Sequence, residues 1–310
     1  MALRELLTFL PDGLKEELNV IPPPLLQEIE EVRIRVLKPV EVIARGRPKF
    51  LRYRATLEDS VTILNKISQY SIYALEEELK RGYITVSGGH RIGLAGKVVT
   101  EHGAVKAIRH VTSFNIRVAK EKVGISNPFV PYVYGGKWLN TLIFGPPQTG
   151  KTTLLRDFAR LISSGTDRIK PAKVGIVDER SEIAGSVKGI PQHQFGIRVD
   201  VLDACPKAEG MMMLIRSMSP DVIIADEIGR KEDTDALFEA INSGVQLFVS
   251  AHGESFEDLL LRPTVREIIQ AGIFDRYILL SRRQDVPGNV EKIMDRKGKE
   301  VPIKARVTPT

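Results

Sequence analysis

The chain has 310 residues, of which 43% are apolar, 27% are charged and 6% are aromatic. This composition supplies a sizeable core and length enough for two domains, and it excludes a wholly disordered chain and a collagen-like one. Cys205 is the single cysteine, so no disulfide can form within the chain. A secreted disulfide scaffold is therefore excluded, and a reducing cytoplasm is the expected compartment.

Charge and apolar runs constrain the partners. No apolar run approaches the roughly 20 residues that cross a bilayer. The N-terminal stretch carries Glu5 and lacks a signal-like apolar core, so a short amphipathic helix is expected there. Residues 1–139 carry 21 Lys and Arg against 15 Asp and Glu, whereas residues 140–310 carry 24 of each. This basic excess is typical of a solvated surface, although nucleic acid, anionic lipid or an acidic protein are alternative partners.

Residues 1–130 are expected to form a mixed α and β domain. Alternating apolar residues predict strands at 32–36, 40–44, 83–86, 91–99 and 112–118. Apolar residues at helical spacing predict a helix over 56–79, with Thr56 as its N-cap. Residues 119–138 are rich in Gly and Pro, and 131–138 are predicted to be the linker to the next domain.

Residues 139–310 show strand-sized apolar runs that alternate with helical stretches. The predicted strands lie at 142–144, 174–177, 222–225, 247–250 and 277–280, and the predicted helices at 151–163, 206–217 and 231–243. This alternation is typical of an α/β domain whose mainly parallel sheet is covered by helices on both faces. The tail after Gly288 is polar and is expected to be loosely ordered.

The sequence Gly-Pro-Pro-Gln-Thr-Gly-Lys-Thr at 145–152 matches the phosphate-loop (Walker A) pattern G-x-x-x-x-G-K-[ST] in full. An apolar strand precedes it and an amphipathic helix follows, which is the context that the motif requires. Backbone N–H groups in such a loop point at phosphate oxygens, Lys151 contacts the β- and γ-phosphates, and the Thr152 hydroxyl binds Mg²⁺. The predicted nucleotide-binding residues are Gly145, Pro146, Pro147, Gln148, Thr149, Gly150, Lys151, Thr152 and Thr153.

Two acids end the apolar strand Val-Ile-Ile-Ala at 222–225. Carboxylates at the carboxyl end of a strand beside a phosphate loop reach the metal and a water molecule. We therefore expect Asp226 to hold Mg²⁺ and Glu227 to act as the general base that polarises the attacking water. The predicted reaction is metal-assisted hydrolysis of the γ-phosphate by a P-loop NTPase.

An extra strand at 174–177 lies between these two motifs, as in RecA-like and AAA+ motors, whereas small GTPases lack it. Asp178 and Glu179 follow it and would lie at the same sheet edge, with Glu179 as a second catalytic acid. Ser250 and His252 follow another apolar strand, where a histidine can sense the γ-phosphate. An ordinary surface or core role remains the alternative for all four residues.

Residues 216–230, RSMSPDVIIADEIGR, resemble the Walker B segment of the secretion-type motor ATPases that serve type II and type IV secretion and pilus retraction. The acids near Asp178 and the histidine near His252 fit the same family, although SAHG stands where its members typically have Thr-Leu-His-Ala. Segments such as PQHQFGIRVDVLDACPKAEGMMM and RGYITVSGGHRIGLAGKVV are similar to a sporulation branch of these ATPases, over nearly the whole chain.

This resemblance implies an N-terminal domain followed by a RecA-like ATPase domain, assembled as a hexameric ring with ATP sites at subunit boundaries. It implies ATP rather than GTP, and arginines supplied in trans, for which Arg91, Arg117 and Arg198 are the candidates. It also implies a cytoplasmic ATPase on the mother-cell side, peripheral at the membrane. There it would energise membrane-embedded channel proteins that link mother cell and forespore during endospore formation.

Two other functions stay open on the sequence. A RecA-like nucleic-acid motor is the first, but the basic N-terminal part has few aromatic residues to stack bases and no recognisable binding motif, so nucleic acid is not the expected partner. A nucleotide-gated scaffold with little turnover is the second, and the acid at Glu227 argues against it. Residues 211–213, three methionines, are expected in the core, and Cys205 has no Cys/His cluster that would make a zinc site.

Overall fold

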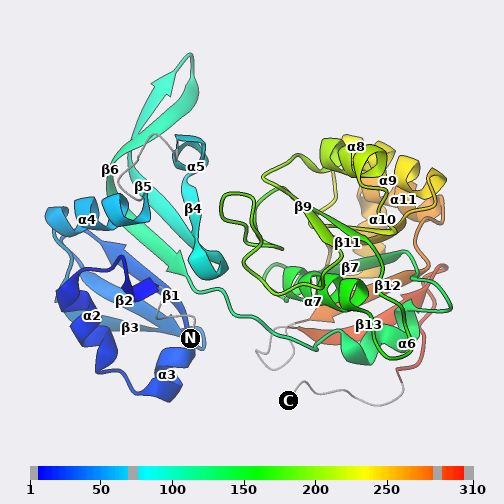
Figure 1. Cartoon of the computed structure of the whole chain (residues 1–310), viewed down its shortest axis with the longest axis horizontal. Helices are drawn as coiled ribbons and strands as arrows, with labels where there is room; N and C mark the ends of the chain where they lie inside the picture. The colour runs from blue at the N-terminus through cyan, green and yellow to red at the C-terminus, as the bar shows by residue number, and fades with distance from the viewer. Residues whose placement is uncertain (1–5, 69–75, 282–287, 304–310) are drawn as a thin grey trace. The chain divides into compact units, whose positions relative to one another are not determined.

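The computed structural model describes residues 6–68, 76–281 and 288–303. The chain forms two compact units (Figure 1), one of residues 1–120 with 185–192 and one of residues 121–184 with 193–310. Within the described residues, no helix is both long enough and apolar enough to cross a membrane.

The first unit is built on a six-stranded antiparallel sheet with the order β3-β2-β1-β6-β5-β4. Its strands are β1 (Ile29–Arg35), β2 (Pro39–Ala44), β3 (Arg47–Arg54), β4 (Tyr83–Val86), β5 (His90–Glu101) and β6 (Ala104–Arg117). All five predicted strands of this part are confirmed. Strand β3 was not predicted because half of its sequence, RPKFLRYR, is charged and its side chains are mostly exposed.

Short helices complete the first unit: α2 (Asp12–Asn19), α3 (Pro23–Gln27), α4 (Leu57–Ile67) and α5 (Glu76–Arg81). Helix α4 begins where it was predicted, because the Thr56 hydroxyl accepts the backbone N–H of Asp59 at 3.1 Å and the Asp59 carboxylate accepts that of Thr56 at 2.7 Å. The predicted single helix over 56–79 is wrong at its middle, since α4 ends at Ile67. The stretch 69–75 lies outside the described residues, as do residues 1–5 of the predicted N-terminal helix.

The second unit contains a seven-stranded sheet with the order β13-β12-β7-β11-β10-β8-β9. Its strands are β7 (Thr141–Gly145), β8 (Val174–Asp178), β9 (Val199–Asp203), β10 (Val222–Ala225), β11 (Gln246–His252), β12 (Arg276–Ser281) and β13 (Asn289–Asp295). All neighbouring pairs are parallel except β12 with β13, which confirms the predicted α/β class with a mainly parallel sheet. The expectation of a loosely ordered tail after Gly288 is wrong for β13, where Ile293 and Met294 are buried.

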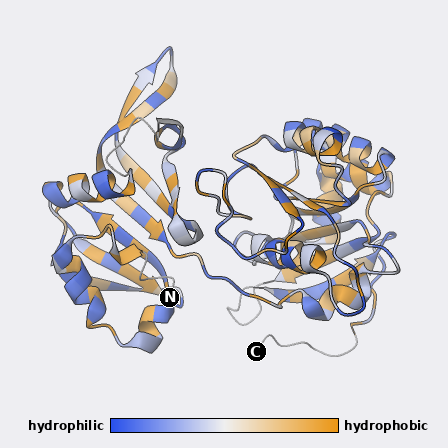
Figure 2. Cartoon of the chain, in the orientation of Figure 1, coloured by the Kyte–Doolittle hydropathy of each residue, from blue (hydrophilic) through white to orange (hydrophobic). Residues whose placement is uncertain are grey.

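Helices cover both faces of this sheet (Figure 1): α6 (Val130–Val133), α7 (Lys151–Ser164), α8 (Lys207–Ser217), α9 (Lys231–Asn242), α10 (Phe256–Leu261) and α11 (Pro263–Gln270). Neighbouring residues of one strand belong to opposite faces. Ile143 packs in the cluster that includes α7, whereas Phe144 packs in the cluster that includes α8 to α11. Both faces of the sheet are therefore buried under apolar side chains, and the central strands form the hydrophobic centre of the unit (Figure 2).

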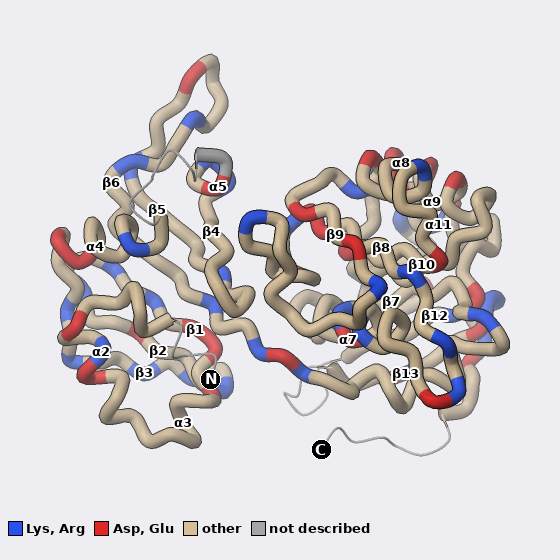
Figure 3. Tube along the Cα trace, in the orientation of Figure 1, with Lys and Arg blue, Asp and Glu red and all other residues tan. Residues whose placement is uncertain are grey.

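Charged residues lie mainly in the helices and connecting segments of the second unit (Figure 3), and strands β7 and β10 carry none. The methionine run divides: Met211 is buried as expected, but Met213 faces solvent because α8 packs on one face only. The strands therefore provide an apolar frame, and polar groups gather where the strands end.

The Gly- and Pro-rich stretch before β7 is packed rather than linker-like. Phe129, Val133 and Trp138 are buried in the cluster that includes α7. The Asp157 carboxylate on α7 accepts the backbone N–H groups of Gly124 at 3.0 Å and Ser126 at 2.7 Å. The predicted linker 131–138 is therefore part of the second unit, because its apolar and aromatic side chains are buried there.

Candidate functional site

The phosphate loop connects β7 to α7, and its glycines are required by its geometry. A Cβ atom on Gly145 would lie 2.5 Å from the carbonyl oxygen of Leu280 and 2.9 Å from the hydroxyl of Thr149. Gly150 has a φ of 92°, in the left-handed region that favours glycine. Gln148 also has a positive φ, of 61°, so the loop curls tightly just before the helix. Pro147 is exposed beside it, and Thr153 is half-buried in the first turn of α7.

Lys151 is the first residue of α7 and is buried. Its Nζ donates to the carbonyl oxygens of Gly145 and Pro146, each at 2.8 Å, and lies 3.4 Å from Nδ1 of His252. Burial lowers the pKa of Lys151, and the negative charges of Asp226 and Glu227 oppose that shift. The lysine thus rests on the carbonyls of its own loop, close to where phosphate oxygens would enter.

The two predicted metal ligands lie together. The Thr152 hydroxyl donates to Oδ2 of Asp226, which follows β10, and the Ser250 hydroxyl of β11 donates to Oδ1 of the same carboxylate. Ser250 also accepts the backbone N–H of Glu227 at 3.0 Å. The parallel neighbours β10 and β11 bring these groups to one sheet edge. Thr152 and Asp226 present hard oxygen atoms, which are the donors that Mg²⁺ takes.

Glu227, the predicted base, is engaged through both carboxylate oxygens. Oε1 lies 3.0 Å from Nε2 of His252, and Oε2 lies 2.7 Å from NH1 of Arg180. Because Lys151 is a donor toward Nδ1 of His252, the fitting neutral tautomer carries its proton on Nε2 and donates it to Glu227. His252 therefore lies between the loop lysine and the acid. Its predicted role at the γ-phosphate stays a prediction.

The acids after β8 have separate roles. The Asp178 carboxylate is buried and accepts the backbone N–H groups of residues Glu182 at 2.8 Å, Ile183 at 3.0 Å and Ala184 at 2.8 Å. Burial raises the pKa of Asp178 to about 6, against the opposing effect of those three N–H donors. Asp178 thus holds the turn 182–184 in place.

Glu179 lies in the same pocket but is paired with cations. Its carboxylate forms ion pairs with Lys207 and, at 3.3 Å, with Arg230. Burial opposes ionisation of Glu179, but Lys207 and Arg230 outweigh it and lower the pKa below its usual range. These charge partners leave Glu179 as an ionised residue next to the predicted base.

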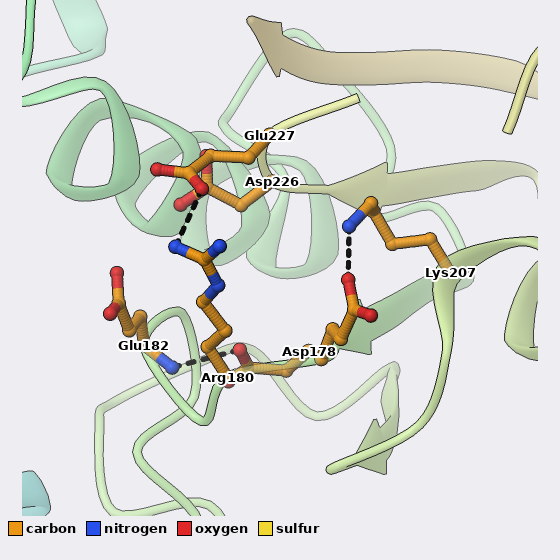
Figure 4. A pocket seen from close by; sticks show the side chains of 7 residues that line it. Asp178, Arg180, Glu182, Lys207, Asp226 and Glu227 are labelled. Atoms are coloured by element: carbon orange, nitrogen blue, oxygen red, sulfur yellow. Dashed lines mark hydrogen bonds and ion pairs between the residues drawn. The ribbon is translucent and has the colours of Figure 1, made fainter. Parts of the chain in front are cut away.

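A small pocket collects these groups (Figure 4). It is lined by Asp178, Glu179, Arg180, Glu182, Lys207, Asp226 and Glu227. Arg180 and Lys207 were not predicted as site residues. Arg156 was also not predicted: from α7 it donates to the carbonyl oxygens of Ile183 at 2.7 Å and Glu182 at 2.6 Å. The position of Arg180 next to Asp178 and Glu179 was a signal that could have identified it.

The three candidate trans arginines have partners within their own units. In the first unit, Arg91 stacks over the ring of Tyr83, 3.6 Å from its centroid, and Arg117 lies 3.7 Å from Glu31. In the second unit, Arg198 precedes β9, and its carbonyl accepts the backbone N–H of Val174 at the start of β8. It is exposed at the amino ends of the strands, whereas the phosphate loop lies at their carboxyl ends.

The sequence matches one protein family over almost its whole length. The family described as "Sporulation stage III, protein AA" covers residues 6–301. A relative from Bacillus subtilis (strain 168), named Stage III sporulation protein AA, is 59% identical over 296 residues, which are 96% of this chain and 96% of the relative. A relative from Arabidopsis thaliana, Protein SEEDLING PLASTID DEVELOPMENT 1, is 29% identical over 201 residues, which are 63% of this chain and 28% of that protein.

Two solved structures share the fold. The pilus retraction motor PilT with bound ADP is similar with a TM-score of 0.58 and 17% identity, over 86% of this chain and 76% of that chain. The ATPase DotB from Yersinia pseudotuberculosis is similar with a TM-score of 0.59 and 14% identity, over 94% of this chain and 78% of that chain. These two likenesses concern the fold, whereas the family model and the Bacillus subtilis relative show the family: the chain belongs to the stage III sporulation protein AA family.

Proposed function

We propose that this chain is a Mg²⁺-dependent ATPase that hydrolyses ATP to ADP and phosphate. The observation that carries the proposal is the meeting of Lys151, the Thr152–Asp226 pair and Glu227 at the carboxyl ends of β7, β10 and β11. A cation for phosphate, a pair of metal-binding oxygens and a carboxylate for water are the three parts that phosphoryl transfer to water needs. The ADP in the PilT structure supports a nucleotide as the ligand.

The donor set fits magnesium better than a metal held by protein alone. Among residues 6–68, 76–281 and 288–303, no group of three or more His, Cys, Asp and Glu is arranged to hold a metal ion. Mg²⁺ keeps several waters and takes one or two protein ligands together with substrate phosphates, so Thr152 and Asp226 suffice. When bound, the ion would neutralise negative charge on the phosphate oxygens.

The residues of the chain supply positioning and charge. Lys151 exchanges the carbonyls of Gly145 and Pro146 for phosphate oxygens, which give it a stronger, charged partner. Glu227 orients the attacking water and accepts its proton, and His252 holds the second carboxylate oxygen. Glu179 adds negative charge to the same pocket, where Lys207 and Arg230 keep it in place.

We further propose that the protein acts as a homo-hexameric ring in the cytoplasm. There it would be peripheral to a membrane and would energise membrane-embedded channel proteins between mother cell and forespore. Support comes from the 59% identity to Stage III sporulation protein AA and from the fold shared with a pilus retraction motor. The first unit would serve as the N-terminal domain of the ring and the second as its ATPase domain. Arg91, Arg117 and Arg198 are the proposed candidates for contacts with nucleotide in a neighbouring copy.

The test is ATP turnover of the purified chain over nanomolar to micromolar protein, with nucleotide binding measured in parallel. Lys151→Ala should lose both binding and turnover, because the phosphate cation is removed. Glu227→Gln should keep ATP bound but unhydrolysed, because the amide accepts no proton. Specific activity should rise with protein concentration if the site is completed by a neighbouring copy.

Other outcomes point to other functions. Turnover of Glu227→Gln at the wild-type rate would show that Glu227 is not the general base. Flat specific activity with monomers at every concentration would contradict the ring. Turnover that DNA stimulates in a salt-sensitive way would favour a nucleic-acid motor. Binding without turnover at any concentration would favour a nucleotide-gated scaffold.

A further inference from the structure

The pocket beside Glu227 contains an arginine that the proposed reaction does not yet use. Arg180 follows β8 by two residues, and its guanidinium NH1 lies 2.7 Å from Oε2 of Glu227 (Figure 4). Its side chain is 58% exposed, unlike that of the other cation lining the pocket, Lys207, which is 7% exposed. Of these two cations, Arg180 is therefore the one whose charged group can move without leaving a buried position.

The backbone around Arg180 is anchored on both sides. Two residues before it, Asp178 is buried and accepts three backbone N–H groups of the turn 182–184. Arg156 of the phosphate-loop helix donates to two carbonyl oxygens of the same turn. Because the turn is held from β8 and from α7, the backbone beside Arg180 is fixed while its long side chain reaches Glu227.

The ion pair has a consequence for a catalytic base. Glu227 has one oxygen with Arg180 and the other with His252, so a water molecule that binds either oxygen must share it with one of these partners. A terminal phosphate carries more negative charge than a carboxylate, and a guanidinium binds phosphate oxygens in a bidentate manner. A phosphate entering beside Lys151 therefore competes with Glu227 for Arg180.

We propose that Arg180 senses the terminal phosphate of a nucleoside triphosphate within its own chain. In the structure it pairs with Glu227. When the triphosphate binds, the guanidinium exchanges the carboxylate for the terminal phosphate, and Glu227 becomes free to take a water molecule. This inference rests on the proposed ATPase function, and it differs from the trans arginines because it concerns the subunit that holds the phosphate loop.

The experiment compares equilibrium binding of a non-hydrolysable ATP analogue and of ADP, by calorimetry with Mg²⁺, to the full chain and its variants. Arg180→Gln should weaken the ATP analogue roughly 10- to 100-fold, the range of a lost charge-assisted hydrogen bond, and change ADP less than about 2-fold. Arg180→Lys keeps the charge and should recover part of the loss. Arg262→Gln is the matched control: Arg262 is also exposed and paired, at 3.5 Å with Asp258 one turn earlier on α10, and its replacement should change neither affinity.

A double-mutant cycle with Glu227 tests the exchange itself. Glu227→Gln removes the competing charge, so it should tighten the ATP analogue a few-fold, and that gain should vanish when Arg180→Gln is added. Equal weakening of ADP and the ATP analogue by Arg180→Gln, or additive effects in the cycle, would overturn the proposal. If the four proteins of the cycle bind the analogue as expected but the wild type never hydrolyses ATP, the proposed ATPase activity is refuted and the proposed role of Arg180 is supported. Wild-type chain that binds neither nucleotide would refute both.

Discussion

Ser250 connects the two acids of the site: its hydroxyl donates to the carboxylate of Asp226 and accepts the backbone N–H of Glu227 at 3.0 Å. Ser250 is fully buried at the end of β11, next to β10, which the two acids follow. One small side chain thus orients the proposed metal ligand and fixes the backbone of the proposed base. Glu227 itself has a φ of 54°, in the left-handed region, so that backbone needs a partner to hold it.

Replacing Ser250 by alanine should therefore loosen both acids. We expect the free energy of unfolding to fall by about 1–3 kcal/mol, because a buried donor and a buried acceptor each lose a partner. The Mg²⁺ concentration for half-maximal turnover should rise several-fold. Denaturant unfolding and a Mg²⁺ titration measure the two effects. Ser217→Ala removes an exposed hydroxyl that bonds the Met213 carbonyl and serves as the control; equal results for the two variants would contradict this role.

Gly145 should not tolerate a side chain. The Cβ of Gly145→Ala would lie 2.5 Å from the Leu280 carbonyl oxygen, so β7 or β12 must shift and the phosphate loop with it. We expect nucleotide affinity to fall at least about tenfold and stability by about 1–3 kcal/mol, as for an overpacked core. Gly135→Ala is the control, because a Cβ there meets nothing within 4 Å. Normal nucleotide binding by Gly145→Ala would show that the loop adapts.

Asp157 holds the stretch before β7 onto the second unit. Its carboxylate accepts the N–H groups of Gly124 and Ser126, the Ser126 hydroxyl and the guanidinium of Arg160. Asp157→Ala should lower the free energy of unfolding by about 3 kcal/mol, as when one partner of a buried ion pair is removed. Protease cleavage between residues 121 and 138 should become faster, and unchanged cleavage would refute the anchoring role.

The contribution of Asp157 to stability should depend on pH with a defined sign. Burial disfavours the charged form of Asp157, but Arg160, Ser126 and Gly124 outweigh it and lower the pKa. A lowered pKa in the folded state stabilises the protein above the ordinary aspartate pKa and is lost as the pH falls through the folded value. The difference in the free energy of unfolding between wild type and Asp157→Asn should therefore shrink in acid. A difference that stays constant with pH would contradict the lowered pKa of Asp157.

Asp178 should show the opposite dependence. Burial raises its pKa to about 6, so the folded protein binds a proton that the unfolded chain has released between about pH 4 and pH 6. Its contribution to stability is present at low pH and is lost as the pH rises through 6, by at most about 1.4 kcal/mol per pH unit. Asp178→Asn lacks this titration, so wild type should lose stability relative to the variant between pH 4 and pH 6. If the free energies of unfolding of wild type and Asp178→Asn changed with pH in parallel, Asp178 would not be the buried carboxyl that binds this proton.

Features that depend on residues close together in the chain were predictable from the sequence. The phosphate loop was recognisable because its geometry depends on consecutive residues: Gly145 and Gly150 allow the curl, and Lys151 and Thr152 begin the helix. Strand β10 was predicted because its four residues are all apolar and both faces of the sheet are buried. Thr56 as a helix cap is likewise a contact between residues three apart.

The contacts between residues far apart in the sequence became visible in the folded structure alone. The sheet order places β8, β10, β11 and β7 side by side, and so brings Arg180 to Glu227 and Ser250 to Asp226 across long stretches of sequence. It also places Arg198 at the opposite edge of the sheet from the phosphate loop. Strand order depends on how two helical layers bury their apolar faces, and no spacing within the sequence encodes that. Charged side chains near a strand end therefore gave no indication of their partners.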